Sequence, residues 1–141
     1  MGREENKAMA RQFVEEIIVG DGLDKLKDYL TDDYVDHSLP PGVPAGAEGL
    51  KQLIGMFKGA SPDLKVTYED MIAEGDKVVM RVTNTGTHKG EMMGIPASGK
   101  SVNFSEIHIM RVAGGKFAEH WGLEDNMALM QQIGAMPEMG G

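Results

Sequence analysis

The sequence predicts an α+β fold, in which N-terminal helices pack on a curved antiparallel sheet of about four long strands and a short helix follows at the C-terminal end. Apolar residues recur at helical spacing as far as residue 58, and from residue 64 onward they alternate as they do in strands. Short glycine turns join the alternating segments into hairpins, and a helical pattern returns after residue 125. This order favours helices laid on one face of an antiparallel sheet.

Three helices are expected in the first half of the chain. The clearest covers residues 6–19, begins with its own capping asparagine and ends at Gly20. A second, shorter amphipathic helix is expected over residues 23–30, and a third over residues 47–58, where the apolar side chains share one face. Residues 31–37 between them have the composition of a short extended segment, and a loop rich in proline and glycine follows it.

Four strands are expected in the second half, paired as two hairpins. The turn of the first hairpin contains Gly75, and the turn of the second is the Gly114-Gly115 pair. A connection rich in glycine and proline separates the two hairpins. The expected strands are residues 64–73, 77–88, 101–112 and 116–122.

The composition is that of an ordinary globular protein, and we expect a single domain over residues 1–141. The absence of cysteine excludes disulfides, thiolate zinc sites and a cysteine nucleophile. The net charge of −8, with scattered basic residues, disfavours nucleic acid and anionic membranes as partners. Because no apolar run approaches the roughly 18 residues of a membrane span and the N-terminus lacks the apolar core of a signal peptide, we expect a cytoplasmic protein.

The histidines are the first candidates for chemistry, because phosphate-binding glycine loops, HExxH and GxSxG motifs are all missing. In the second hairpin, a two-residue turn places Val112 opposite Phe117 and, further along, His108 opposite Trp121. His120 would then fall on the other face. A slip of one residue reverses this assignment, so the choice between the two histidines stays open.

Asp125 has two interpretations, as a helix cap or as a catalytic base. The same strand pairing puts it near the end of the face that carries His108, where a carboxylate at the mouth of an apolar cavity would lose hydration and gain basicity. An aspartate directly before a helical pattern is also typical of an N-cap, which is worth about 1 kcal/mol. The position alone does not exclude either role.

Two further features could be either functional or structural. His37 ends an acidic segment and could assist catalysis or lie exposed in a loop, whereas His88 is expected at the surface, at the end of a strand. Across the first hairpin, Asp70 would stand opposite Arg81 as a surface ion pair. An arginine flanked by carboxylates could also polarise a water molecule or an epoxide.

Four segments, in this order and spacing, resemble the SnoaL-like polyketide cyclase family, within the superfamily named after nuclear transport factor two. The resemblance covers nearly the whole chain and implies a cone-shaped α+β barrel, with a hydrophobic pocket inside and a homodimer outside. The segments are "NKAMARQFVEEI", "LTDDYVDH", "SPDLKVTYEDMIAEGDKVVMRVTNTGTHKGEMMGIPASGKSVNF" and "RVAGGKFAEHWGLEDNMALMQQIG".

The resemblance also implies an activity, a ring-closing intramolecular aldol step run without a metal or an organic cofactor. On the family's pattern, the aspartate base falls on Asp125, and the assisting histidines fall on His37 and His108. The partner would be a small apolar carbonyl compound. We assign the pocket lining to Tyr34, Phe57, Met93, Met110, Trp121 and Leu129.

The leading hypothesis is therefore a proton-transfer enzyme of cyclase type with an aspartate general base. The first alternative is a non-catalytic module that binds small hydrophobic ligands, because fold similarity alone transfers no reaction. The second is an epoxide hydrolase or isomerase of the same superfamily, and epoxide hydrolysis would need Arg81 inside the cavity. The aromatic content of 6% and the many methionines favour a softer cavity than one that stacks a rigid polycycle.

Overall fold

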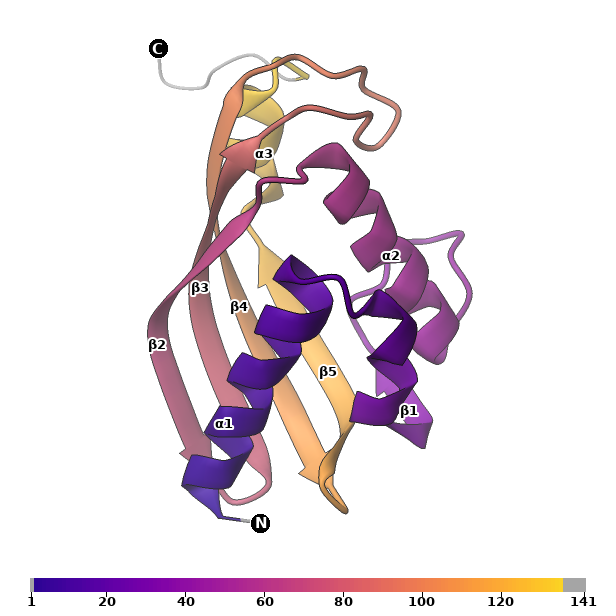
Figure 1. Ribbon diagram of the computed structural model, residues 1–141, viewed down its shortest axis with the longest axis vertical. Helices are drawn as coiled ribbons and strands as arrows, with labels where there is room; N and C mark the ends of the chain where they lie inside the picture. Colours follow the sequence, from indigo (N-terminus) through magenta and orange to yellow (C-terminus); the bar gives the residue numbers. More distant parts are fainter. Residues whose placement is uncertain (1, 136–141) are drawn as a thin grey trace.

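The computed structural model describes residues 2–135 and shows five strands in one curved sheet with helices against it (Figure 1). The strand order is β1-β5-β4-β3-β2, in which β1 runs parallel to β5 and the other neighbours are antiparallel. In chain order the elements are α1 (Arg3–Phe13), η1 (Val14–Val19), η2 (Leu23–Tyr29), β1 (Leu30–Asp36), α2 (Gly46–Ala60), β2 (Lys65–Glu74), β3 (Lys77–Thr87), β4 (Ser101–Ala113), β5 (Lys116–Glu124) and α3 (Asn126–Gln132).

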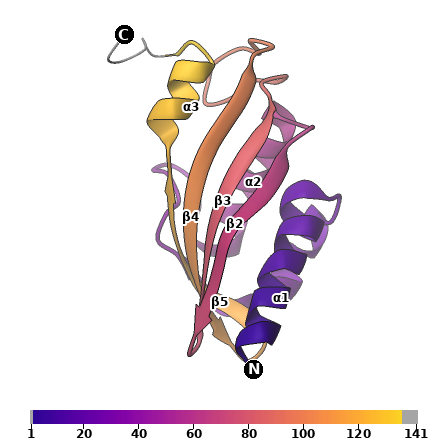
Figure 2. The ribbon, with the colours of Figure 1, turned by 90° about the vertical axis from the view of Figure 1, so that its left-hand side faces the viewer.

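The predicted fold class is confirmed, with differences of detail at the sheet edges. The extended segment after the second helix joins the sheet as β1, and it pairs in parallel with β5 rather than standing alone. Strands β1 and β2 are the two edges, so the sheet stays open and does not close into the barrel that the resemblance implied. Figure 2 shows α1 and α2 on the same side of this curved sheet, with α3 at the end remote from the N-terminus.

The helices also differ in kind from the expectation. The first begins at Arg3, and its last turn is the π-helix η1; the second is a 3-10 helix. Gly20 does end the first helix, because its backbone is extended there. A larger residue would not fit, since a Cβ at this position would come within 2.5 Å of the Glu15 carbonyl oxygen. Within residues 2–135, no helix is both long and apolar enough to cross a lipid bilayer.

The main core lies between the sheet and the helices that cover it. Ala10, Val14 and Ile17 recur at intervals of three and four residues, so they form one buried stripe along α1 and η1. Phe13 meets Phe117 of β5 edge to face, with ring centroids 5.5 Å apart. A second, smaller cluster packs under α3 and is made of Ala60, Met92, Val102, Phe104, Leu129 and Ile133.

A β-bulge in β5 fixes which side chains reach the inside of the molecule. Val112 pairs with Phe117 as predicted, but Arg111 pairs with Glu119, so Ala118 is an extra residue in the strand. Beyond the bulge, His108 stands opposite Gly122 rather than Trp121. The predicted pairing was therefore wrong by one residue. As a consequence, every side chain of β5 after Ala118 lies on the face opposite to the one expected.

Shortening a side chain of the buried stripe should destabilise the packing of the helices on the sheet. Ile17→Ala, at a side chain that is 0% exposed, is expected to lower the free energy of unfolding by about 2–5 kcal/mol. Ile72→Ala removes the same atoms from a side chain that is 58% exposed on β2, and should cost less than about 1 kcal/mol. Urea denaturation followed by circular dichroism measures both, and equal losses would contradict this account of the core.

Candidate active site

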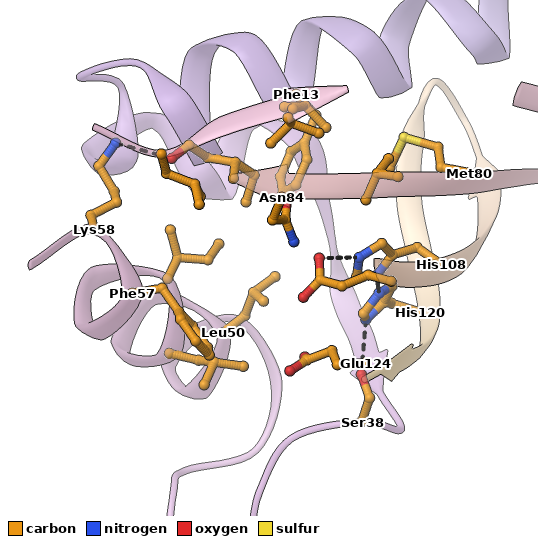
Figure 3. A pocket seen from close by; sticks show the side chains of 18 of the residues that line it. Phe13, Ser38, Leu50, Phe57, Lys58, Met80, Asn84, His108, His120 and Glu124 are labelled. Carbon is orange, nitrogen blue, oxygen red and sulfur yellow. Dashed lines mark hydrogen bonds and ion pairs between the residues drawn. The ribbon is translucent and has the colours of Figure 1, made fainter. Parts of the chain in front are cut away.

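A cavity of about 140 Å³ lies between the helices and the face of the sheet that they cover. Most of its lining is apolar, and Leu50 and Phe57 of α2 form one wall (Figure 3). On the other wall, His108, His120 and Glu124 lie together, and the amide of Asn84 projects between the two walls. On the sheet side, the polar lining comes from four strands and one loop, and comprises Tyr34, Asp36, Ser38, Asn84, Glu106, His108, His120 and Glu124. On the helical side, Lys58 of α2 and Ser61 directly after it also belong to the lining.

Four of the polar side chains form a continuous chain of hydrogen bonds across three strands. The Nδ1 atom of His120 lies 2.9 Å from a carboxylate oxygen of Asp36, and its Nε2 atom lies 2.9 Å from Nδ1 of His108. The Nε2 atom of His108 in turn lies 3.0 Å from Oε1 of Glu106. The two imidazole rings are stacked with centroids 5.1 Å apart. A proton can therefore be shared along a line from β1 to β4.

Asp36 anchors one end of this chain as a buried carboxylate. Its side chain is 1% exposed, and it accepts hydrogen bonds from the Tyr34 hydroxyl at 2.7 Å and from both the backbone nitrogen and the hydroxyl of Ser38. Burial disfavours the charge, but the donors, with His120 foremost, outweigh it and hold the pKa of Asp36 well below its usual range. Burial and the neighbouring Asp36 charge raise the pKa of Tyr34 far above its usual value. Asp36 is therefore a fixed negative charge.

Glu106 and Glu124 stand directly opposite each other on β4 and β5, and their environments push their pKa values apart. Burial works against the charged form of Glu106, but the hydrogen bond and charge of His108, with the amide of Asn84, lower its pKa. Burial and the charge of Glu106 raise the pKa of Glu124. No donor within residues 2–135 forms a hydrogen bond to the Glu124 carboxylate. Carboxyl groups tuned in opposite directions are a feature of acid–base sites.

The surroundings of His108 favour a positive charge on its ring. Burial works against its imidazolium form, but the hydrogen bond and charge of Glu106, together with the charges of Glu124 and Asp36, outweigh burial and raise the pKa of His108. Both ring nitrogens of His108 are engaged by protein side chains. Within the described residues, no group of three or more His, Asp or Glu side chains has the geometry to hold a metal ion.

Asp125 caps α3, so the cap interpretation is confirmed. Its Oδ1 atom accepts a hydrogen bond from the Ala128 nitrogen at 3.0 Å, its side chain is exposed, and it is not part of the cavity lining. The base role predicted for it requires the carboxylate inside the cavity. The carboxylates found there are those of Asp36, Glu106 and Glu124, the last of which is one residue earlier in the chain. Sequence reasoning missed Glu124, although its pairing with Glu106 would follow from the correct register.

His37 and Trp121 lie outside the cavity, on the other face of the sheet. Their rings stack with centroids 4.9 Å apart, and Nε2 of His37 lies 2.7 Å from Oε2 of Glu119. Glu119 also accepts a hydrogen bond from Nε of Arg111 at 2.9 Å. The bulge at Ala118 is the reason for the wrong placement of Trp121, because it turns this residue outward and His120 inward.

The remaining predicted lining residues divide into two groups. Tyr34, Phe57 and Met110 line the cavity, together with His108. Met93 lies exposed in the connection between β3 and β4, and Leu129 is fully buried in the cluster under α3. Neither of these two belongs to the lining.

Two other expectations have a clear outcome. His88 is fully buried rather than at the surface, and its Nδ1 atom lies 2.9 Å from the Ser98 hydroxyl, because the β3–β4 connection folds over it. The pairing of Asp70 with Arg81 is confirmed, with Nε of the arginine 2.7 Å from the carboxylate. Arg81 is exposed and does not line the cavity, so the arrangement required for epoxide hydrolysis is not present.

Gly122 makes room for the pair of histidines. A Cβ atom at this position would lie 3.0 Å from Cε1 of His120 and 3.1 Å from Nδ1 of His108. Gly122→Ala is therefore expected to separate the rings and to cost about 1–3 kcal/mol of stability, because buried ring nitrogens lose their partner. Gly59→Ala in α2, where a Cβ meets no atom within 4 Å, should be neutral or stabilising. Thermal unfolding compares the two, and a harmless Gly122→Ala would contradict the close fit.

The raised pKa of Glu124 predicts a pH-dependent cost in stability. The folded state holds this proton more tightly than the unfolded state, so the contribution of Glu124 to stability falls as the pH rises from the ordinary value of 4.5 through the raised pKa. Glu124→Gln should remove this fall and be more stable than the wild type at pH 8. Glu74→Gln, at an exposed position, should follow the wild type. Urea unfolding of the wild type and of Glu124→Gln at pH 4 and pH 8 measures the difference. A wild type that is more stable than Glu124→Gln at pH 8 would contradict the prediction.

Comparisons with known proteins agree with the fold. A family model described as SnoaL-like polyketide cyclase matches residues 8–133. The chain is 26% identical over 113 residues to nogalonic acid methyl ester cyclase of Streptomyces nogalater, covering 79% of this chain and 84% of the relative. It is also 26% identical over 110 residues to aklanonic acid methyl ester cyclase DauD of Streptomyces sp. (strain C5), covering 77% of this chain and 66% of the relative.

Among solved structures, TsrD from Streptomyces laurentii is similar over nearly its whole length. The TM-score is 0.84 at 32% sequence identity, with 96% of this chain and 99% of that chain covered. Since the family model spans most of the chain and the fold agrees, the protein belongs to the SnoaL-like polyketide cyclase family.

Proposed function

We propose that the protein is a proton-transfer enzyme that closes a ring in a small, largely apolar carbonyl compound by an intramolecular aldol reaction. The observation that carries the proposal is Glu124, a carboxylate that faces an apolar cavity, has a raised pKa and accepts no hydrogen bond from residues 2–135. Relatives named as cyclases of polyketide methyl esters support the reaction type. We propose that no metal or organic cofactor takes part, as the family resemblance implies.

Glu124 would act as the general base. Its ionised carboxylate takes a proton from a carbon between two carbonyl groups, which is already acidic, and the resulting enolate carbon attacks a third carbonyl of the same molecule. A carbon–carbon bond forms, and the attacked oxygen becomes an alkoxide. The alkoxide takes a proton back from the Glu124 carboxyl, so the substrate is isomerised and the enzyme returns to its starting state.

The other polar groups of the wall would stabilise the negative charge that develops on the substrate. His108 contributes a nearby positive charge, but its ring nitrogens are engaged with His120 and Glu106, so it acts by its field rather than by giving up its own proton. The amide of Asn84 projects into the cavity and can donate a hydrogen bond to an oxygen of the substrate. The apolar opposite wall excludes water and strengthens both effects.

A pair of neighbouring carboxylates tests the assignment of the base. Glu124→Gln should lower the rate of deuterium exchange at the acidic carbon of a 1,3-dicarbonyl probe by about 10²–10⁴-fold, because the proton acceptor is lost. Asp125→Asn should exchange at close to the wild-type rate, since asparagine caps a helix about as well as aspartate. Proton NMR in deuterated buffer measures the exchange rate.

The same experiment decides between the alternatives. If Asp125→Asn abolished exchange and Glu124→Gln spared it, the base would be Asp125, as the family pattern implies. The largely apolar lining also fits a module that only binds hydrophobic ligands. Calorimetric binding of carbonyl compounds without any exchange in the wild type would establish that second function and overturn the enzymatic one.

A further inference from the structure

The hydrogen-bond chain from Asp36 to Glu106 has a direction that the contacts of Asp36 impose. We propose that it is a polarised relay, in which Asp36 holds a proton on Nδ1 of His120 and thereby keeps the positive charge on His108, beside Glu124. Asp36 is then a positioning residue that acts on the active site through two imidazole rings. The effect on Glu124 rests on the proposed function, whereas the proton arrangement of the histidines does not.

The first step follows from the donors around Asp36. A carboxylate offers only acceptor sites, and here they are occupied by the Tyr34 hydroxyl, by the backbone and hydroxyl of Ser38, and by His120. A backbone N–H cannot reverse its direction, and the three donors from Tyr34 and Ser38 favour the ionised form of Asp36 although the side chain is buried. The Nδ1 atom of His120 must therefore carry a proton and donate it to Asp36.

The second step determines which ring nitrogens of His108 carry a proton. With its proton on Nδ1, a neutral His120 presents a bare Nε2 atom, so the facing Nδ1 of His108, at 2.9 Å, must be the donor. The other nitrogen of His108 faces Glu106 at 3.0 Å, and the ionised state of Glu106 requires a proton there too. His108 is then an imidazolium with both N–H groups engaged.

The charges around His108 favour this arrangement. Glu106 lies on its own strand, His120 and Glu124 lie on β5, and Asp36 lies on β1. On the helical side, Lys58 of α2 also lines the cavity, but its ammonium group is bound by the backbone carbonyls of residues 17, 18 and 20. Three carboxyl groups thus surround one imidazolium.

Asp36→Asn should reverse the polarity of the whole chain. The asparagine oxygen can still accept from Ser38, but its NH₂ group then faces His120 and can only donate. Nδ1 of His120 becomes an acceptor, its proton moves to Nε2, and His108 must accept at Nδ1 while it donates from Nε2 to Glu106. The positive charge disappears from His108, although every hydrogen bond of the chain is retained.

The loss of this charge has a predictable effect on Glu124. The positive charge of His108 lowers the pKa of Glu124, so its removal should raise that pKa further. The acidic limb of the pH–rate profile should therefore move to higher pH in Asp36→Asn. We expect kcat to fall by at least about 10–100-fold, the range found when a partner that orients a metal-bound histidine is replaced.

The nitrogen-15 chemical shifts of the imidazole rings test the relay directly, because they distinguish protonated from bare ring nitrogens. At neutral pH the wild type should show His120 with the proton on Nδ1 and His108 with both nitrogens protonated. Asp36→Asn should show His120 with the proton on Nε2 and His108 neutral, also with its proton on Nε2. A neutral His108 in the wild type, or the same proton positions in both proteins, would overturn the proposal.

Two variants guard against a trivial result. Asp33→Asn, at an exposed position of the same strand, should leave both histidines and the pH–rate profile unchanged. If Asp36→Asn does not fold, Tyr34→Phe replaces it: this variant removes one donor but keeps the carboxylate, so both proton positions should persist, and a reversal would overturn the relay. A protein with the expected tautomers but no exchange activity would refute only the proposed function. Exchange activity with different tautomers would refute only the relay.

Discussion

The extra residue in β5 is the constraint on which the candidate site depends. Without Ala118, alternation along the strand would send His120 to the outer face of the sheet and bring Trp121 inside. The bulge instead sets two histidines side by side on the inner face, above a glycine that leaves room for both. A local change in strand pairing thus replaces an aromatic surface by a group of ionisable side chains.

Burying these ionisable side chains costs free energy, and most of their charges are offset by a hydrogen-bond or ion-pair partner. Asp36 is surrounded by donors, and Glu106 is matched by His108. Glu124 faces the Glu106 carboxylate across the strands and accepts no hydrogen bond from residues 2–135, and burial together with the Glu106 charge outweighs the attraction of His108. Such an uncompensated group is typical of functional sites, where stability is given up for chemistry. The contrast between Glu106 and Glu124 is therefore the clearest sign of function in the molecule.

Local patterns were sufficient for the elements, but not for the site. Helical spacing predicted the helix over residues 47–58, and glycine turns predicted both hairpins. Helices and hairpins could be predicted because they depend on residues that are close together in the sequence. The bulge leaves no such signal, since Ala118 fits either strand face, and one missed residue reversed the places of His120 and Trp121. Burial of His88 depends on a connection that folds over it, which no periodicity reports.

The outer contacts of His37 acquire a purpose when they are considered together with its neighbour in β1. Its backbone nitrogen donates to the His120 carbonyl, and its ring lies on Trp121 with Glu119 at its tip. The residue before it, Asp36, contacts Nδ1 of the His120 ring on the inner face of the sheet. The end of β1 is thus held to β5 by contacts on both faces of the sheet. Separation of β1 from β5 would therefore break the contact of Asp36 with His120 and the stacking of His37 on Trp121 at the same time.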